Sequence, residues 1–281
     1  MERRNFIKST AALSALSLVT PELAFARDTM PIGLQLYTVR DLMASDPAGT
    51  LKQIADLGYQ VVEGAGYDKR SVFGVKSDEF RRMLDDNGLK MVSMHTVSPY
   101  LKNSLEETLE DAKKLGNSYL ILAWLFPEER TSIDDYKKVI DLLITSSEAA
   151  KSYGIQLGYH NHEFEFISLD DQVPYDLMMK ELPGDMPMEL DLYWVAKAGL
   201  SADDLFARYP GRFPLWHVKD MDNTPEKGFT EVGNGVIDFQ SIFNEAKLAD
   251  LKYFFVEQDQ TPGSPLDSIK TSIKNVKKII E

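Results

Sequence analysis

The hydrophobic and polar positions of the chain follow two periods that alternate along its length. Short runs rich in β-branched and aromatic residues, typical of strands, are separated by segments whose apolar positions recur every three or four residues, typical of amphipathic helices. The runs predicted to be strands are residues 32–38, 59–64, 89–96, 118–124, 155–162, 186–192, 213–220 and 253–259. The clearest predicted helices span residues 47–58, 77–88, 104–116, 132–154 and 264–281.

Helix-ending signals support this division. The first four predicted helices each end at a glycine, which readily adopts the left-handed conformation that closes a helix: Gly58, Gly88, Gly116 and Gly154. Ser77 and Asp78 predict the N-cap of the second helix. Eight strands that alternate with helices over about 250 residues predict an α/β fold, a (β/α)8 TIM barrel in a single domain. An open doubly wound sheet is the alternative, but no glycine-rich phosphate loop follows the first strand.

The alternation within each predicted strand indicates which side chains point into the barrel. In residues 155–162, Leu157 and Tyr159 share an apolar face that suits packing against helices, so His160 and His162 point inward. Both lie at the C-terminal end of their strand, where barrel enzymes hold their active sites.

Other strands end in inward-facing polar residues by the same test. These residues are Gln35, Tyr37, Glu63, Ser93, His95, Glu189, Asp191, His217, Lys219, Glu257 and Asp259, and Trp124 lies near the end of a strand whose faces the pattern does not distinguish. All four histidines of the chain therefore lie at or near strand ends. A lone inward histidine is usually a hydrogen-bonded core residue, and for Gln35, Tyr37 and Glu63 a structural and a substrate-binding role are equally open.

Two imidazoles and two carboxylates in this set are balanced in charge around a divalent cation. Burying His160, Asp191, His217 and Glu257 without a counter-charge would be costly, which favours one metal ion held by all four. Nitrogen donors beside oxygen donors suit Mn²⁺, Zn²⁺, Fe²⁺ or Co²⁺ better than Mg²⁺ or Ca²⁺.

The first 26 residues have the pattern of an export signal. They combine a basic start, a short apolar run and an Ala24-Phe25-Ala26 ending, and the string RRNFIK is typical of a twin-arginine signal, with an ordinary secretory signal as the alternative. The expected cut lies between Ala26 and Arg27, an uncleaved anchor being the alternative. We therefore expect a periplasmic protein whose folded domain spans residues 27–281.

Charge and composition exclude several kinds of partner. The signal carries three basic and two acidic residues, so its removal changes the formal charge from −13 to −14. Such a surface disfavours nucleic acid and anionic membranes. No second apolar run of membrane length follows the signal. The chain has no cysteine, which excludes disulfides, thiolate ligands and a cysteine nucleophile.

Seven stretches of residues 31–281 together resemble the xylose isomerase-like TIM barrels, also described as the sugar phosphate isomerase/epimerase superfamily. They are IGLQLYTVRD, LGYQVVEG, GYHNHEFEF, MELDLYWV, WHVKDM, GNGVIDFQSIF and FFVEQD. The resemblance implies one divalent metal held by His160, Asp191, His217 and Glu257. It also places Trp194 where relatives carry a substrate-binding histidine, and Glu63 and His95 at positions beside the substrate.

His160 departs from the family pattern, because many members carry glutamate there. In those relatives this glutamate and the one on the eighth strand form the acid–base pair, whereas an imidazole bound to metal has no lone pair left for a proton. Glu257 matches the eighth-strand glutamate of those relatives and can still serve as a base. The second base has to be one of four other residues: His162, His95, Lys219 or Glu163.

The resemblance implies an exported, metal-dependent isomerase or epimerase that works through a metal-bound enediolate. An unphosphorylated sugar fits the periplasm better than a sugar phosphate. Alternatives are a lyase or dehydratase that acts by β-elimination on a 3-keto-glycoside, and a non-catalytic carbohydrate-binding barrel. We expect Glu257, His162 and Lys219 to be catalytic. The expected substrate contacts are Gln35, Tyr37, Glu63, His95, Trp124 and Trp194. Barrel relatives often form homo-oligomers, but no segment of this sequence indicates that state.

Overall fold

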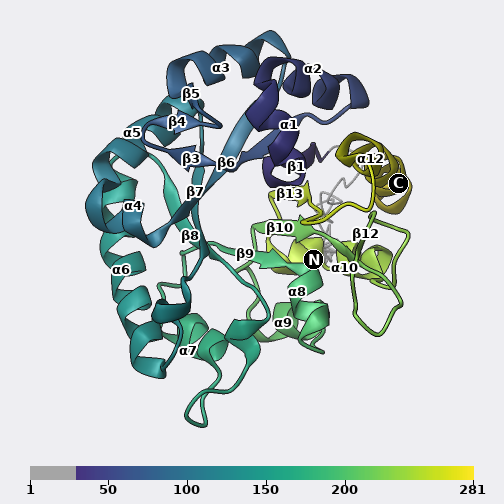
Figure 1. Cartoon of the computed structure of the whole chain (residues 1–281). Helices are drawn as coiled ribbons and strands as arrows, with labels where there is room; N and C mark the ends of the chain where they lie inside the picture. The colour runs from purple at the N-terminus through teal and green to yellow at the C-terminus, as the bar shows by residue number, and fades with distance from the viewer. Residues whose placement is uncertain (1–29) are drawn as a thin grey trace, which may run out of the picture.

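The computed structural model describes residues 30–281, in which the eight predicted strands close into a parallel barrel (Figure 1). Around the barrel they follow their order in the sequence, and the last pairs with the first. This confirms the predicted (β/α)8 fold and excludes the open sheet. The barrel strands are β1 (Ile32–Gln35), β2 (Val61–Gly64), β6 (Lys90–Val97), β7 (Tyr119–Trp124), β8 (Gln156–His160), β9 (Met188–Asp191), β10 (Leu215–Val218) and β13 (Tyr253–Val256).

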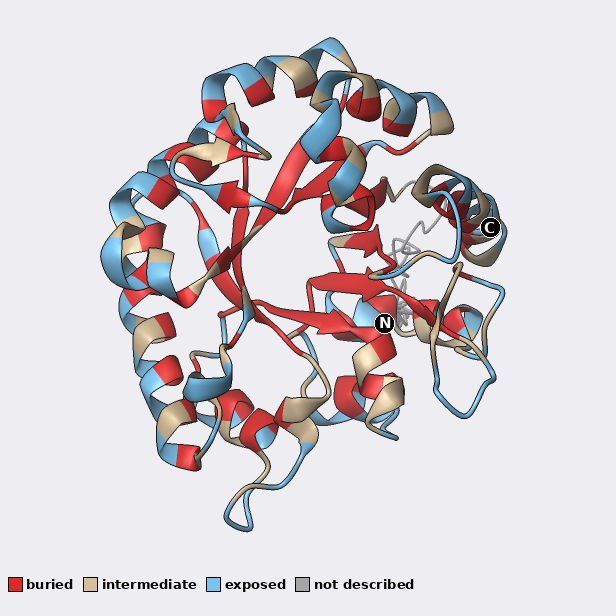
Figure 2. Ribbon diagram, viewed as in Figure 1, coloured by how far each residue is buried: buried red, intermediate tan, exposed pale blue. Residues whose placement is uncertain are grey.

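Helices surround the barrel, with their buried residues toward the strands and their exposed residues toward solvent (Figure 2). The α-helices are α1 (Arg40–Ser45), α2 (Pro47–Leu57), α3 (Ser77–Asp86), α4 (Ser98–Asn103), α5 (Leu105–Leu115), α6 (Ile133–Lys151), α7 (Pro174–Glu181), α8 (Leu192–Lys197), α9 (Ala202–Arg208), α10 (Phe239–Asn244), α11 (Ala246–Ala249) and α12 (Pro265–Ile280). The 3-10 helices are η2 (Leu36–Val39), η3 (Pro127–Glu129) and η4 (Phe164–Phe166).

Two small antiparallel sheets lie in the connections between strands and helices. One joins β3 (Tyr67–Asp68), β4 (Ser71–Val72) and β5 (Val75–Lys76), and the other joins β11 (Asp220–Met221) and β12 (Phe229–Thr230). The second sheet follows β10 and brings Phe229 against Tyr193, with ring centroids 4.5 Å apart. The alternating pattern did not predict these sheets because each of their strands has only two residues.

The element boundaries differ from the predicted ones at specific points. β1 ends at Gln35, and Leu36–Val39 form a 3-10 helix instead of continuing the strand. The N-cap of α3 is Lys76 rather than Ser77 and Asp78, which lie inside the helix. The predicted export signal at residues 1–26 lies outside the described residues.

Apolar side chains pack in two places, outside and inside the barrel. Leu157 and Tyr159 belong to the large core between strands and helices, as the alternation predicted. A smaller cluster fills the barrel itself: Val61, Val92, Tyr119, Ile121, Leu215 and Phe255. A Cβ on Gly33 would lie 2.6 Å from the ring of Phe255, so the glycine leaves room for that ring. The barrel is therefore a packed core whose polar side chains collect above this layer.

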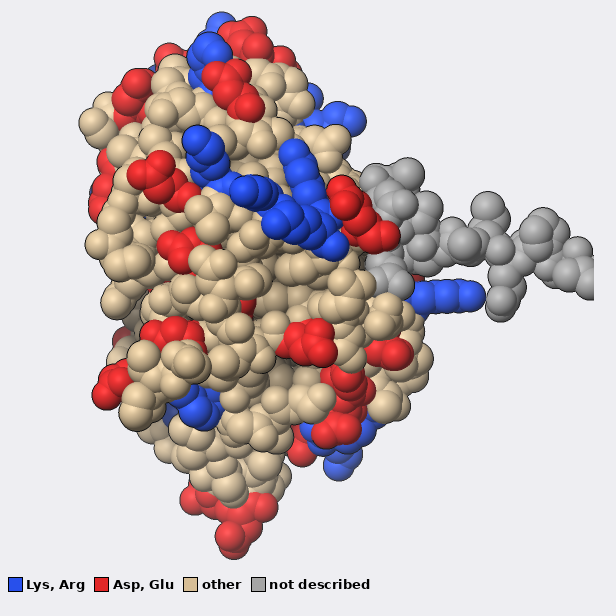
Figure 3. Space-filling model, turned by 90° about the vertical axis from the view of Figure 1, so that its right-hand side faces the viewer, with Lys and Arg blue, Asp and Glu red and all other residues tan. Residues whose placement is uncertain are grey.

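The outer surface carries both signs of charge. The exposed lysines of α12 are Lys270, Lys274, Lys277 and Lys278. Figure 3 shows basic side chains gathered on the side of the molecule where α12 lies, with acidic side chains around them. Neighbouring opposite charges weaken each other's field, so this side is not uniformly basic. Within residues 30–281, none of the helices has the length and apolarity needed to span a bilayer.

Candidate metal centre and active site

His160, Asp191, His217 and Glu257 come together as predicted, and we call them the outer cluster. Each offers one ligand atom, and these four atoms lie within 4.8 Å of one another. The shortest approaches join His217 Nδ1 to Glu257 Oε2 at 2.7 Å and His160 Nε2 to Asp191 Oδ2 at 3.3 Å. All four side chains are buried.

Strand register explains why the outer cluster forms. β10 pairs with β9 so that His217 lies beside Asp191, and both side chains point to the barrel axis. His160 is the last residue of β8, and Glu257 directly follows β13. Asp191 also accepts a hydrogen bond from the backbone N–H of Trp194 at 3.0 Å, so it caps α8 while its other oxygen faces the cluster. Four neighbouring strand ends thus supply four donors at one height.

The donor set fits a divalent cation. Two carboxylates would balance its charge, and two imidazoles favour a transition metal over Mg²⁺ or Ca²⁺. Burial lowers the pKa of His160 to about 4, which keeps its ring neutral and its nitrogen lone pair available. His160 Nε2 is the ring nitrogen that faces the other donors, 3.3 Å from Asp191 Oδ2, and Nδ1 is buried without a hydrogen-bond partner among the described residues.

A second group, Glu63, His95, Glu189 and His217, lies one layer deeper, and we call it the inner cluster; His95 is half-buried and the other three are buried. Glu189 precedes Asp191 by two residues on β9, so it points inward farther from the mouth of the barrel. His95 Nε2 lies 2.8 Å from Glu189 Oε2 and 3.1 Å from Glu63 Oε2. The strand pattern predicted that Glu189 faces inward, but gave no reason to place it in the site.

His217 belongs to both clusters because its two ring nitrogens face opposite ways. Nδ1 faces Glu257 in the outer cluster, whereas Nε2 lies 2.6 Å from Glu63 Oε2 in the inner one. Glu63 also accepts hydrogen bonds from Gln35 at 2.7 Å and Ser93 at 2.6 Å. A carboxylate that accepts Nε2–H fixes the tautomer whose Nδ1 is free to bind a metal.

The charges of the inner cluster favour that arrangement. Burial works against an ionised Glu63, but His95 and His217 hold the pKa of this carboxyl well below its usual range. Burial lowers the pKa of His95, and Glu63 and Glu189 outweigh it and raise that pKa to about 9. Glu63 is therefore an anion placed to accept the His217 proton.

Replacing Glu63 by glutamine is expected to weaken metal binding about 10- to 100-fold, the usual loss when a carboxylate behind a histidine ligand is removed. The dissociation constant, measured by competition with a chelating dye, checks this. Glu107→Gln on the exposed face of α5 is the matched control and should leave it unchanged. Equal affinities for Glu63→Gln and the unaltered protein would show that Glu63 does not orient His217.

A cavity of about 690 Å³ opens over the outer cluster at the C-terminal ends of the strands. Its volume lies within the usual 300–1,000 Å³ range of small-molecule sites. Of the predicted site residues, it is lined by Tyr37, His95, Trp124, His160, His162, Trp194, Lys219 and Glu257. Gln35, Glu63, Asp191 and His217 are fully buried below it and do not line it. Glu63 thus lies beneath the floor, in contact with the candidate metal donor His217, and Gln35 lies there in contact with Glu63.

His162 stands between the metal donors and the aromatic wall of the cavity. Its ring lies 4.9 Å from that of His160 and stacks on Phe164 at 5.2 Å. Glu165 accepts a hydrogen bond from the backbone N–H of His162 at 2.8 Å and another from the Tyr159 hydroxyl. The Nδ1 atom of His162 has no hydrogen-bond partner among the described residues. His162 is therefore held by its backbone and its ring face.

Lys219 is buried among carboxylates. Its Nζ lies 3.0 Å from Asp191, 2.8 Å from Glu257 and 2.9 Å from Asp259. Burial lowers the pKa of Lys219, but these carboxylates outweigh it and raise the pKa well above its usual value. The predicted catalytic lysine is thus an ammonium group that neutralises its neighbours rather than a free base.

Several cavity residues were not predicted from the sequence. Arg40, Arg130, Phe164, Lys197 and Phe229 all line it. They lie beyond the strand ends, where the alternation that identified the inward residues no longer applies. Phe164 follows His162 at the same two-residue spacing, which was the available signal for it.

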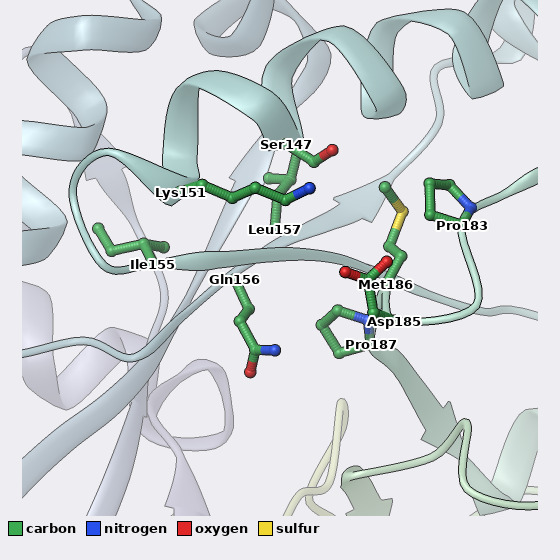
Figure 4. A pocket seen from close by; sticks show the side chains of 9 residues that line it. All are labelled: Ser147, Lys151, Ile155, Gln156, Leu157, Pro183, Asp185, Met186 and Pro187. Carbon is green, nitrogen blue, oxygen red and sulfur yellow. The ribbon is translucent and has the colours of Figure 1, made fainter.

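A smaller cavity of about 190 Å³ lies at the opposite end of the barrel (Figure 4). It is bordered by the end of α6, the start of β8 and the segment before β9. Lys151 and Asp185 are its charged residues, and Lys151 already pairs with Glu148 at 2.7 Å. No cluster of metal donors borders it among the described residues, so the chemistry belongs to the mouth of the barrel.

Comparisons with known proteins agree with this geometry. The family described as xylose isomerase-like TIM barrel matches residues 51–279. A sugar phosphate isomerase/epimerase from Parabacteroides distasonis is 27% identical, with a TM-score of 0.77 over 87% of this chain and 96% of that chain. A second from the same organism is 24% identical, with a TM-score of 0.79 over 98% and 100%. The IOLI protein with a bound zinc atom is 16% identical, with a TM-score of 0.72 over 89% and 98%. Curated proteins gave no match.

Proposed function

The chain belongs to the xylose isomerase-like TIM barrel family, and from this premise we propose that it is a divalent-metal-dependent isomerase or epimerase of an unphosphorylated sugar. The observation that carries the proposal is the cavity above the four metal donors, which is lined both by Glu257, itself one of the donors, and by His162. A sugar offers vicinal oxygens for the cation and a C–H bond beside a carbonyl for the base.

His160, Asp191, His217 and Glu257 are the residues that would hold the metal, with Mn²⁺, Zn²⁺, Fe²⁺ or Co²⁺ as candidates. The IOLI protein of similar fold contains zinc. When bound, the cation supplies Lewis acidity that polarises a carbonyl and makes the neighbouring C–H bond more acidic.

Glu257 is the proposed base that removes the proton from carbon. One of its oxygens is fixed by His217 Nδ1 and by the Lys219 ammonium at 2.8 Å, and the residue lines the cavity. Lys219 thereby orients the carboxylate and balances charge at the floor. Delivery of the proton to the adjacent carbon gives isomerisation, and delivery of a proton to the opposite face of the same carbon gives epimerisation.

His162 is the proposed second acid–base group. Of the other three candidates, His95 is bound to Glu63 and Glu189, and Lys219 to three carboxylates. Glu163 lines the cavity but belongs to neither cluster of metal donors. His162 lines the cavity, and Phe164 and Glu165 hold its orientation. It takes the place of the glutamate that many relatives carry at position 160.

The preference for an unphosphorylated sugar rests on the sequence of residues 1–26. Their twin-arginine pattern supports export to the periplasm, and this pathway carries folded proteins, which suits metal loading before export.

Hydrogen exchange into a sugar tests the proposed chemistry. The metal-loaded protein is incubated in D₂O with a panel of unphosphorylated aldoses and ketoses, and the C–H signal beside the carbonyl is followed by NMR. We expect deuterium to enter substrate and product together. A metal-replete protein that exchanges no proton in any of these sugars would contradict the proposal.

A lyase that acts on a 3-keto-glycoside by β-elimination is the second candidate. The lining of the cavity favours it, because aromatic side chains such as Trp124 and Phe229 offer contacts to a second group besides the metal donors. Release of the aglycone, the group joined to the sugar through the glycosidic bond, from a 3-keto-glycoside would support the lyase. If sugars raise the melting temperature but neither reaction occurs, the barrel is a carbohydrate-binding protein.

A further inference from the structure

Three basic side chains stand around the mouth of the cavity without an acidic partner. Arg40, Arg130 and Lys197 line it, each is half-buried, and none forms an ion pair with any residue between 30 and 281. They come from the segments that follow β1, β7 and β9, so they surround the opening. In a chain with a formal charge of −13, three unpaired cations at one opening need an explanation.

Aromatic rings hold these cations in place. The Arg130 guanidinium lies 3.7 Å from the ring centroid of Phe164 and 4.9 Å from that of Trp124. Lys197 lies 5.0 Å from the ring of Trp194. Such contacts fix the position of a cation without neutralising its charge. Lys197 also donates a hydrogen bond to the Tyr193 hydroxyl at 3.0 Å, and Arg40 donates one to the Tyr37 carbonyl at 2.9 Å, so both keep further donors for a ligand. The Arg130 Nε atom is buried and has no hydrogen-bond partner among the described residues.

The same rings form a continuous wall from the floor to the opening. Trp124 and Trp194 lie 4.8 Å and 5.4 Å from His162, which lies 4.9 Å from the metal donor His160. A ligand whose sugar reaches the donors therefore places its next ring between aromatic side chains and beside Arg130. The cavity volume of about 690 Å³ leaves room for this second ring.

The charges that line the cavity are divided between its floor and its opening. Glu257 and Asp259 both pair with Lys219 at the floor, and Glu163 is the remaining acidic residue among those that line the cavity. The opening thus carries excess positive charge, whereas the rest of the chain is acidic. Such a field attracts an anionic group and holds it with charge-assisted hydrogen bonds.

We propose that this opening is a second binding subsite, so that the substrate is a glycoside whose second ring carries a carboxylate. The sugar ring lies on the floor, the second ring packs between Trp124 and Trp194, and the carboxylate binds Arg130 with help from Arg40 and Lys197. This inference rests on the proposed function for the sugar end of the ligand. The second ring and its charge follow from the opening itself.

Binding of matched glycosides tests the subsite without any turnover. The full-length, metal-loaded protein is titrated by calorimetry with 4-carboxyphenyl β-D-glucoside, phenyl β-D-glucoside, D-glucose and D-glucose 6-phosphate. We expect the carboxylated glycoside to bind about tenfold tighter than the phenyl glycoside, which is about 1.4 kcal/mol, and the advantage to shrink as salt is added. D-Glucose 6-phosphate, which has the charge without the second ring, should bind no tighter than glucose.

Arg130→Met keeps an unbranched side chain on Phe164 and removes the charge. It should abolish the tenfold preference for the carboxylated over the phenyl glycoside, because that preference depends on the charge of Arg130. Lys197→Met provides the same test if the Arg130 variant does not fold. Arg82→Met on the exposed outer surface of α3 is the control and should keep the preference.

Two results would overturn the proposal. One is equal affinity for the charged and neutral glycosides. The other is D-glucose 6-phosphate binding as tightly as the carboxylated glycoside, which would make the opening a phosphate site for a single sugar. Neither depends on proton exchange, so a protein that exchanges no deuterium but keeps the tenfold preference would refute the isomerase and retain the subsite.

Discussion

Replacing Glu257 by glutamine is expected to lower kcat/KM for deuterium exchange about a thousandfold while the chain stays folded. A positioned general base contributes about 10²–10⁴ to a rate, and glutamine cannot accept the proton. Glutamine keeps the shape of the side chain, and its amide oxygen can face Lys219. In the unaltered protein Lys219 Nζ lies 2.8 Å from the Glu257 carboxylate. The rate of deuterium incorporation in D₂O and the far-ultraviolet circular dichroism spectrum check the two halves of this prediction.

Asp259→Asn is the matched control for Glu257→Gln. Asp259 also pairs with Lys219, at 2.9 Å, but does not belong to the outer cluster. Its replacement removes one of the three carboxylates around Lys219, and it should alter the rate less than about tenfold because Asp259 has no part in the proposed proton transfer. Wild-type exchange in the Glu257 variant, or equal losses in the two variants, would remove Glu257 from the role of base.

Removing the metal is expected to abolish exchange and to lower the melting temperature by roughly 8–16 °C. A ligand present at a thousand times its dissociation constant stabilises the folded state by about 4 kcal/mol. In a domain of this size each kcal/mol moves the melting temperature by about 2–4 °C. The chain should stay folded without metal, because Lys219 and His217 still pair with the carboxylates of the outer cluster. Differential scanning calorimetry with and without a chelator measures the shift.

Asp191→Asn separates the metal ligand from the helix cap that the same residue provides. Asparagine caps a helix as well as aspartate, so the hydrogen bond to Trp194 N–H is kept while the charged donor is lost. The chelator should therefore shift the melting temperature of this variant little. A wild-type protein that contains no stoichiometric divalent metal, and whose melting temperature the chelator leaves unchanged, would refute the metal site.

Most of the fold could be predicted from the sequence because barrel strands have one buried face toward helices. Leu157 and Tyr159 on that face identified the opposite direction for His160, and the structure agrees. The ends of the strands were predicted less accurately, since the hydrogen bonds near a strand end depend on what the following residues contact. Leu36–Val39 leave the strand pattern and form a 3-10 helix, with Gln35 accepting the N–H of Tyr37.

The candidate site was predictable in part for the same reason. Residues at strand ends, such as His217 and Glu257, point to the same side of the sheet and lie at a similar height along the barrel axis, whatever conformation the loops adopt. The inner cluster was not predictable, because the partners of Glu63 depend on the relative heights of strands that are far apart in the sequence. Glu63 reaches His217 across the barrel, 154 residues away in the chain.

The sequence by itself determined the barrel, the inward direction of its polar side chains and the four candidate metal donors. These depend on periodicity and side-chain chemistry, which are local properties of the chain. Only the tertiary structure decided that His217 joins two clusters, that Lys219 is neutralised by three carboxylates, and that Arg130 stands unpaired at the opening. These properties depend on distances between separate strands and loops, and the closure of the barrel sets those distances.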